Sequence, residues 1–150
     1  MWARGALAAR RPRIAPRVRR HELGVFMQFG SHGTLESNTF RDNTVGVEAS
    51  WTDRTVIRGN TFRGNGTGFL SQTIENGIDE AWTVVESNTF SRNGDGIRSN
   101  RPGVQIGRNV ATNNTGWGIY AELAVDLGGN VARRNGNEPQ CVGVVCTPRP

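Results

Sequence analysis

One pattern recurs five times along the chain, and each copy is anchored on an asparagine. The copies are TLESNTFRDNTVGVEA from Thr34, VIRGNTFRGNGTGFLS from Val56, VVESNTFSRNGDGIRS from Val84, QIGRNVATNNTGWGIYA from Gln105 and DLGGNVARRNGN from Asp126. The anchors are Asn38, Asn60, Asn88, Asn109 and Asn130, with spacings of 22, 28, 21 and 21 residues. Repeats of roughly 20 to 50 residues are typical of stacked architectures, so this pattern predicts a solenoid.

Other positions stay in register with the anchor. An apolar residue lies three positions before it, Phe or Ala lies two positions after it, and a second asparagine lies five positions after it. These columns are Leu35, Ile57, Val85, Ile106 and Leu127; Phe40, Phe62, Phe90, Ala111 and Ala132; and Asn43, Asn65, Asn93, Asn114 and Asn135. A glycine followed by an apolar residue comes eight positions after the first three anchors, as Gly46, Gly68 and Gly96. The fourth copy carries one extra residue, which places its glycine, Gly118, one step later.

The local pattern favours strands over helices. Each repeat holds short apolar–polar alternations separated by Asn and Gly turns. A coil of 21 or 22 residues is too short for two helices and a turn, and the dense leucine frame of a leucine-rich repeat is absent. We therefore predict an all-β fold, a right-handed parallel β-helix solenoid of about five coils.

In such a stack, like residues lie about 4.8 Å apart on neighbouring strands. The phenylalanines would then form an internal aromatic ladder, and the anchor asparagines an amide ladder that tolerates a left-handed turn. The glycine column would supply bends or close backbone approach. Two positions before the anchors, Glu36, Arg58 and Glu86 would face outward and alternate in sign, which favours ion pairing.

The "N-x-F…N…G-hydrophobic" coils resemble the parallel β-helix repeat of the pectate-lyase-like superfamily over residues 24–146. The ending GGNVARRNGNEPQCVGVVC is similar to the last coil and tail of bacterial right-handed β-helix proteins. The resemblance implies the fold and an extracellular or cell-surface location. It leaves the function open, because the superfamily includes lyases, hydrolases, epimerases and adhesins.

The charge is unevenly distributed. Seven of the 18 basic residues lie in the first 20 positions, whereas residues 21–150 carry 11 basic and all 13 acidic side chains, a net charge of −2. We expect residues 1–23 to form an Arg-rich tail, unstructured or capping, residues 24–137 to form the repeats, and residues 138–150 to form a C-terminal tail. The near-neutral repeats argue against a nucleic-acid footprint on the body. A basic tail that binds polyanions is a weaker hypothesis.

Cys141 and Cys146 are the only cysteines. We expect a disulfide that pins the tail over the last coil, with two free thiols as the alternative; a structural zinc site would need four ligands. A disulfide would indicate an oxidising compartment, although the N-terminal segment holds no signal-peptide apolar run or membrane span. Since Gly24–Val25 matches Gly46–Val47 and the preceding half-coil is missing, we expect the C-terminal part of a longer secreted β-helix. The open first edge would permit edge-to-edge self-association.

The candidate ligand contacts lie in two loops between coils. They are Trp51, Asp53, Glu75, Asp79, Glu80 and Trp82. If the loops share a side, tryptophan faces would stack on sugar rings beside carboxylates that accept hydroxyl hydrogen bonds. In the alternative, both tryptophans cover coil edges and the acids are solvated.

We find no catalytic constellation. Ser31-His32-Gly33 is weakly similar to the Gly-His-Gly segment of β-helix hydrolases. Neither His21 nor His32 has an acid in a nearby repeat column to orient it as a general base. No metal-ligand cluster or cofactor motif is found. The sequence thus favours a non-catalytic scaffold that binds polysaccharide. The alternative is a fragment of a lyase, glycoside hydrolase or epimerase that acts on acidic polysaccharide.

Overall fold

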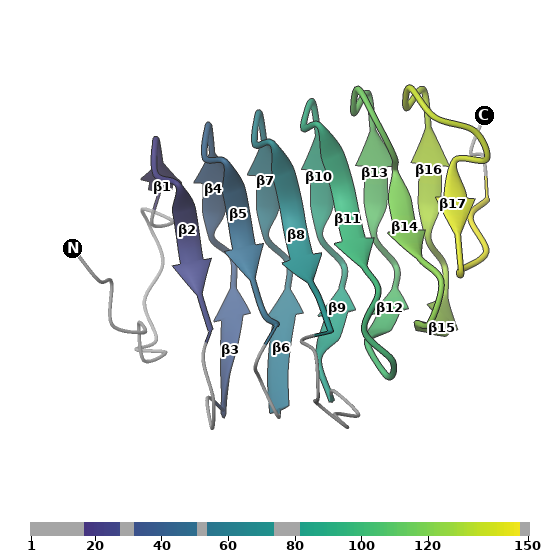
Figure 1. Cartoon of the computed structure of the whole chain (residues 1–150), viewed down its shortest axis with the longest axis horizontal. Helices are drawn as coiled ribbons and strands as arrows, with labels where there is room; N and C mark the ends of the chain where they lie inside the picture. Colours follow the sequence, from purple (N-terminus) through teal and green to yellow (C-terminus); the bar gives the residue numbers. More distant parts are fainter. Residues whose placement is uncertain (1–16, 28–31, 51–53, 74–81, 148–150) are drawn as a thin grey trace.

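The computed structural model describes residues 17–27, 32–50, 54–73 and 82–147. Their strands form three parallel sheets that run the length of the molecule (Figure 1). Sheet A contains β1 (Arg17–Arg19), β4 (Thr39–Arg41), β7 (Thr61–Arg63), β10 (Thr89–Ser91), β13 (Val110–Thr112) and β16 (Val131–Arg133). Sheet B contains β2 (Leu23–Phe26), β5 (Val45–Glu48), β8 (Thr67–Ser71), β11 (Asp95–Ser99), β14 (Ile119–Ala121) and β17 (Cys141–Val142). Sheet C contains β3 (His32–Glu36), β6 (Arg54–Arg58), β9 (Val84–Glu86), β12 (Gln105–Gly107) and β15 (Val125–Gly128).

This arrangement confirms the predicted all-β solenoid of about five coils. The stacked strands extend beyond residues 24–137 at both ends. At the N-terminal end, β1 and β2 pair with β4 and β5. At the C-terminal end, β17 pairs with β14. In the described residues no helix is long and apolar enough to cross a membrane.

The predicted aromatic ladder fills the core. Phe40 and Phe62 stack with ring centroids 4.9 Å apart, and Phe62 and Phe90 stack at 4.6 Å. All three side chains are buried. Ala111 and Ala132 take the same column in the next two coils, so the stacked rings end where the side chains become small.

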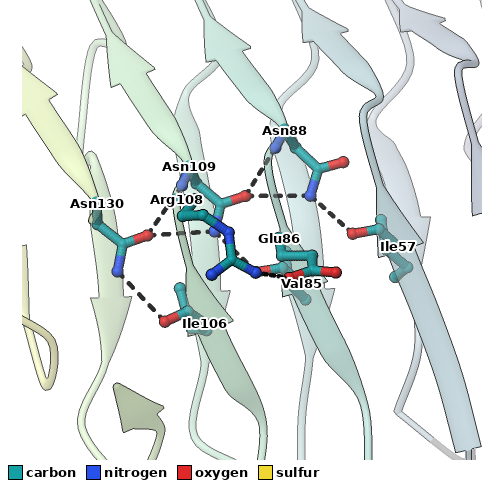
Figure 2. A network of polar contacts seen from close by, with 8 residues as sticks. All are labelled: Ile57, Val85, Glu86, Asn88, Ile106, Arg108, Asn109 and Asn130. Atoms are coloured by element: carbon teal, nitrogen blue, oxygen red, sulfur yellow. Dashed lines mark hydrogen bonds and ion pairs between the residues drawn. The ribbon is translucent and has the colours of Figure 1, made fainter. Parts of the chain in front are cut away.

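The amide ladder is also confirmed, and its bonding repeats from coil to coil (Figure 2). The backbone N–H and side-chain amide of Asn60 both donate to Oδ1 of Asn88, at 2.9 and 3.1 Å. Asn88 donates in the same way to Oδ1 of Asn109, and its Nδ2 also donates to the carbonyl of Ile57 at 2.8 Å. A second ladder of the same kind runs from Asn43 to Asn135. These bonds satisfy polar groups of the asparagines that would otherwise be buried without a partner.

The expectation that the anchor asparagines adopt the left-handed conformation is wrong. The left-handed residue is the one before each ladder asparagine. Before the first ladder these residues are Ser37, Gly59, Ser87, Arg108 and Gly129, and before the second they are Asp42, Gly64, Arg92, Asn113 and Arg134. The residue before the asparagine makes the sharp turn, and the asparagine side chain then points toward the next coil and hydrogen-bonds to it.

The glycine column serves close approach rather than positive φ. A Cβ atom on Gly68 would lie 2.6 Å from Cδ1 of Phe90 and 2.7 Å from the carbonyl oxygen of Gly96. The backbone of sheet B therefore passes against the phenylalanine ladder, and a side chain in this column would separate the two.

The outward charges of sheet C pair as predicted, with one addition. Arg58 lies 3.1 Å from Glu36, and Glu86 pairs with Arg108 of the following turn (Figure 2). The sign of the charge thus alternates over three coils in this column, and Arg108, the residue after Gly107, supplies a fourth charge beside it. Glu36, Arg58 and Arg108 are about half-exposed to solvent, so each pair contributes little to the free energy of folding.

One core position was predicted wrongly. Leu127 was expected to point inward with Ile106, but 39% of its surface is exposed. The register shifts at this point, because Ile106 pairs with Asp126 and Gly107 pairs with Gly128. Leu127 is the extra residue of a β-bulge and points out of the core.

The C-terminal residues close the stack. Gln140 takes the place of the next ladder asparagine, and its Oε1 accepts hydrogen bonds from the backbone N–H and Nδ2 of Asn135 at 2.9 and 2.8 Å. The predicted disulfide between Cys141 and Cys146 is present, with the Cα atoms 6.0 Å apart. Since Cys141 lies in β17 and Cys146 bridges to Asn130, the disulfide joins sheet B to the end of the first ladder.

Candidate ligand-binding site

The loop platform predicted from the sequence lies mostly outside the described residues. Trp51, Asp53, Glu75, Asp79 and Glu80 all fall there. Trp82 is described: it comes shortly before β9, and 61% of its surface is exposed. A large exposed aromatic side chain is compatible with a contact role, and Trp82 is kept as a candidate.

A second aromatic group lies on the outside of sheet B, and it arises from the extra residue of the fourth coil. In the third coil two residues, Gly94 and Asp95, separate the second ladder asparagine from the column glycine. In the fourth coil three residues, 115 to 117, separate them, and the last of these is Trp117. The backbone N–H of Trp117 donates to Oδ1 of Asp95 at 2.8 Å. The insertion therefore pushes Trp117 onto the surface, where Asp95 holds its backbone.

Tyr120 lies beside this tryptophan. Ile119 and Ala121 point into the core from β14, so strand alternation turns Tyr120 outward. The centroids of the Trp117 and Tyr120 rings are 5.0 Å apart and the planes are inclined by 53°. Both side chains are half-buried. The pair presents adjoining aromatic surface to solvent, and Tyr120 lies between Arg98 and Val142 in the outward row of sheet B.

Charged side chains surround the two rings. Arg98 lies opposite Tyr120 on β11, with its guanidinium carbon 6.0 Å from the ring centroid, and it pairs with Asp95 at 3.0 Å. On the other side, the Tyr120 hydroxyl donates to Oε1 of Glu122 at 2.8 Å. The set comprising Asp95, Arg98, Trp117, Tyr120 and Glu122 is called the sheet B cluster below.

The hydrogen bond to Glu122 raises the pKa of Tyr120 above its usual value of 10.0. Partial burial and the negative charge of Glu122 act in the same direction, whereas the positive charge of Arg98 acts against it. Tyr120 therefore stays protonated at neutral pH and donates to Glu122. The carboxylate fixes the orientation of the phenol ring.

The sheet B cluster suits binding better than catalysis. Aromatic rings offer stacking surface, and Arg98 and Glu122 can hydrogen-bond to hydroxyl groups. Asp95 is already engaged by Arg98 and by the backbone of Trp117. In the part of the chain that the structure describes, no group of three His, Cys, Asp or Glu side chains is placed to hold a metal ion.

Sequence reasoning from the repeat columns missed the sheet B cluster. The extra residue of the fourth coil is visible in the sequence, but the repeat columns alone do not say to which side of the sheet it turns Trp117. An insertion into a strand-to-strand turn must bulge outward, because the coil above and below leaves no space inside. A tryptophan at such an insertion, three residues before an outward tyrosine, is the signal that could have identified the site.

The comparisons with known proteins agree with the architecture. A family model described as "Right handed beta helix region" matches residues 18–137. No curated protein and no solved structure matches the chain. The repeat, the three parallel sheets and this match over most of the sequence show that the chain belongs to the right-handed β-helix family.

Proposed function

We propose that the chain is a β-helix domain of a secreted or cell-surface protein that binds polysaccharide without catalysing a reaction. The observation that carries the proposal is the pair of Trp117 and Tyr120, held on the outside of sheet B with charged hydrogen-bonding groups on both sides. Sugar rings stack on aromatic faces, and their hydroxyls bond to carboxylates and guanidinium groups. The stacked sheets make this surface rigid, which limits the entropy lost on binding.

The extracellular location is supported by the disulfide between Cys141 and Cys146, because such bonds persist in oxidising compartments. The non-catalytic role is supported by the engagement of Asp95 in structural bonds. A polysaccharide-cleaving site needs a proton donor or acceptor whose pKa is adapted to the reaction. The Tyr120 hydroxyl is not placed for this role, because it donates its proton to Glu122.

The test is retention of the protein in native gels that contain neutral or acidic polysaccharides. Trp117→Ala should weaken retention by about tenfold, which corresponds to about 1.4 kcal/mol. Trp82→Ala tests the alternative site, the loop platform. Leu127→Ala is the control, since it removes an exposed apolar side chain from β15 of sheet C and should leave retention unchanged. Circular dichroism should confirm that all three variants fold.

Two results would count against the proposal. Unchanged retention in Trp117→Ala would remove the sheet B cluster as the site, and a loss confined to Trp82→Ala would favour the loop platform predicted from the sequence. Release of unsaturated or reducing sugars, with or without Ca²⁺, would contradict the non-catalytic role. It would favour a lyase, hydrolase or epimerase fragment instead.

A further inference from the structure

A column of arginines runs along the outside of sheet A. Arg19, Arg41 and Arg63 lie directly opposite one another on β1, β4 and β7. All three are exposed. Neighbouring parallel strands are about 4.8 Å apart, so the three arginine side chains project from successive strands along the axis of the solenoid.

The residues around this column extend its positive charge. The arginine face is defined here as the outward side chains of residues 17–20, 39–42, 61–64, 89–92, 110–113 and 131–134. It carries Arg17, Arg19, Arg20, Arg41, Arg63, Arg92, Arg133 and Arg134. Within these segments the one carboxylate is Asp42, which lies 3.2 Å from Arg41. Positive charge is therefore concentrated at the β1–β7 end of the sheet, with Arg92, Arg133 and Arg134 farther along and none in residues 110–113.

The expectation of no nucleic-acid footprint on the repeats was based on the net charge of residues 21–150, and that sum conceals this face. The acids that offset it lie elsewhere: Glu36 and Glu86 belong to sheet C, and Glu48 and Asp95 to sheet B. The full chain has a net charge of +5 and a calculated pI of about 10.8. A basic stripe on one face is the electrostatic footprint of a polyanion-binding surface, whatever the average charge of the repeats.

Sheet C provides an internal comparison. There the corresponding outward column reads Glu36, Arg58 and Glu86, so that each charge faces an opposite one. On sheet A the column repeats the same sign, which is unfavourable when like charges lie directly opposite. Departures from such local rules are expected at functional sites. The arginine column is thus better explained by a ligand than by folding.

The chemistry of the face restricts the ligand. Thr39, Thr61 and Thr89 form a second outward column in register beside the arginines. Arginine binds phosphate through two parallel hydrogen bonds, and threonine hydroxyls also donate to phosphate oxygens. No aromatic side chain points outward on the described residues of this face, so neither sugar rings nor unpaired bases find a stacking surface. A narrow straight column also fits a linear polymer better than a bilayer.

We infer that the arginine face binds duplex nucleic acid through its phosphate backbone, without sequence preference. A duplex keeps its bases stacked inside and presents regularly spaced phosphates, which is what a face of arginines and threonines can recognise. Such binding is driven by release of counterions and weakens steeply with salt. This site lies on a different sheet from the polysaccharide site proposed above and does not depend on it.

The experiment measures anisotropy of fluorescein-labelled duplexes of two unrelated sequences, titrated with the full chain between about 50 and 200 mM salt. Wild-type protein should bind both sequences equally. Arg41→Gln with Arg63→Gln should weaken binding to both and reduce the slope of log K against log salt by about 2. Arg54→Gln with Arg58→Gln is the matched control, because it removes the same charge from β6 of sheet C.

The control pair should leave the salt slope within error of wild type. Equal losses in the two double variants would show a general charge effect and overturn the inference. Failure of wild-type protein to bind duplex at the lowest salt would overturn it as well, including when a sulfated polysaccharide does bind. Circular dichroism of both variants should match wild type, since all four side chains are exposed.

Discussion

At the scale of single residues, the ladder asparagines do more than any other side chain to specify this fold. Each one joins its own coil to the next through the backbone N–H and the side-chain amide, and to a carbonyl of the previous coil through Nδ2. An aspartate at this position would keep the acceptor oxygen and the backbone N–H donor but lose both bonds that Nδ2 donates. The bonding explains why asparagine recurs at this position while the residue before it varies.

Replacing an interior ladder asparagine should therefore be costly. Asn88→Ala removes the acceptor of both Asn60 donors and the side-chain donor to the Ile57 carbonyl, while Oδ1 of Asn109 keeps only the backbone N–H of residue 88. Unsatisfied buried groups cost roughly 1–3 kcal/mol each, with relaxation reducing the sum. We expect the free energy of unfolding to fall by about 3 kcal/mol in urea titrations.

The matched control is Asn38→Ala, at the first coil of the same ladder. Asn38 is only half-buried, and its described ladder bonds run to Asn60 alone. Its loss should be no more than about 1 kcal/mol. Equal effects at both positions would mean that the ladder does not act through coil-to-coil bonding.

The pKa of Tyr120 can be measured without overlapping signals from other phenols, because it is the only tyrosine of the chain. Ultraviolet titration should place its pKa above 10.0, and Glu122→Gln should bring the pKa down toward that value. Arg98→Gln should raise the pKa further, since the Arg98 charge favours the phenolate. The hydrogen bond to Glu122 stabilises the fold below the pH at which the unfolded tyrosine ionises, and this stabilisation is lost as the pH rises through the folded pKa. A lower pKa in Arg98→Gln would contradict the assignment.

At the scale of elements, sheets A and B meet where the glycine column passes the phenylalanine ladder. Gly68→Ala would place Cβ 2.6 Å from the Phe90 ring and 2.7 Å from the Gly96 carbonyl, both of which are held by neighbouring coils. Overpacking of this kind costs about 1–3 kcal/mol. We expect Gly68→Ala to lower the thermal midpoint and to broaden the near-ultraviolet signal of the packed core.

Gly33→Ala in β3 is the control for this substitution. Its nearest contact would be Cε of Met27 at 3.8 Å, which is ordinary packing. Because alanine also restricts the unfolded chain, Gly33→Ala should be neutral or slightly stabilising. If both variants lost the same stability, the cost would come from glycine-to-alanine replacement itself and not from the contact between sheets.

Elements built from the repeat were predictable, and elements that depart from it were not. The columns of Phe40, Asn38 and Gly46 reappear in register because neighbouring coils impose the same environment on each copy. The orientations of Leu127 and Trp117 were not predicted, for one common reason. Each lies at a point where its coil has one residue more than the coil before it. A pattern read along the chain places a side chain by counting, and one extra residue turns it to the other face.

The candidate sites were less predictable than the fold. The sheet B cluster joins Asp95 and Arg98 of one coil to Trp117 and Tyr120 of the next, and only the register of β11 against β14 brings them together. The arginine face likewise depends on which of three sheets each charge belongs to. Composition sums these charges, whereas the solenoid separates them onto different surfaces.

At the scale of the whole molecule, the solenoid is a one-dimensional stack. Each coil contacts the coils before and after it, so stability is a sum of coil and interface contributions and depends on how the ends are closed. The C-terminal end is closed by Gln140 and by the disulfide, which together cover the last asparagines of both ladders.

Breaking the disulfide should therefore loosen the stack from that end. Closing a loop as short as Cys141–Cys146 is worth about 2 kcal/mol in the chain-entropy model, and reduction should lower the free energy of unfolding by that amount. Hydrogen exchange should show where stability is lost. After reduction, the backbone amides of β16 and β17 should lose protection, whereas those of β7, two or more coils away, should exchange as before. Cys141→Ser with Cys146→Ser should reproduce this pattern without reductant, and added reductant should then change nothing. Uniform loss of protection along all three sheets would mean that the coils unfold as a single unit and that the closed end does not act locally.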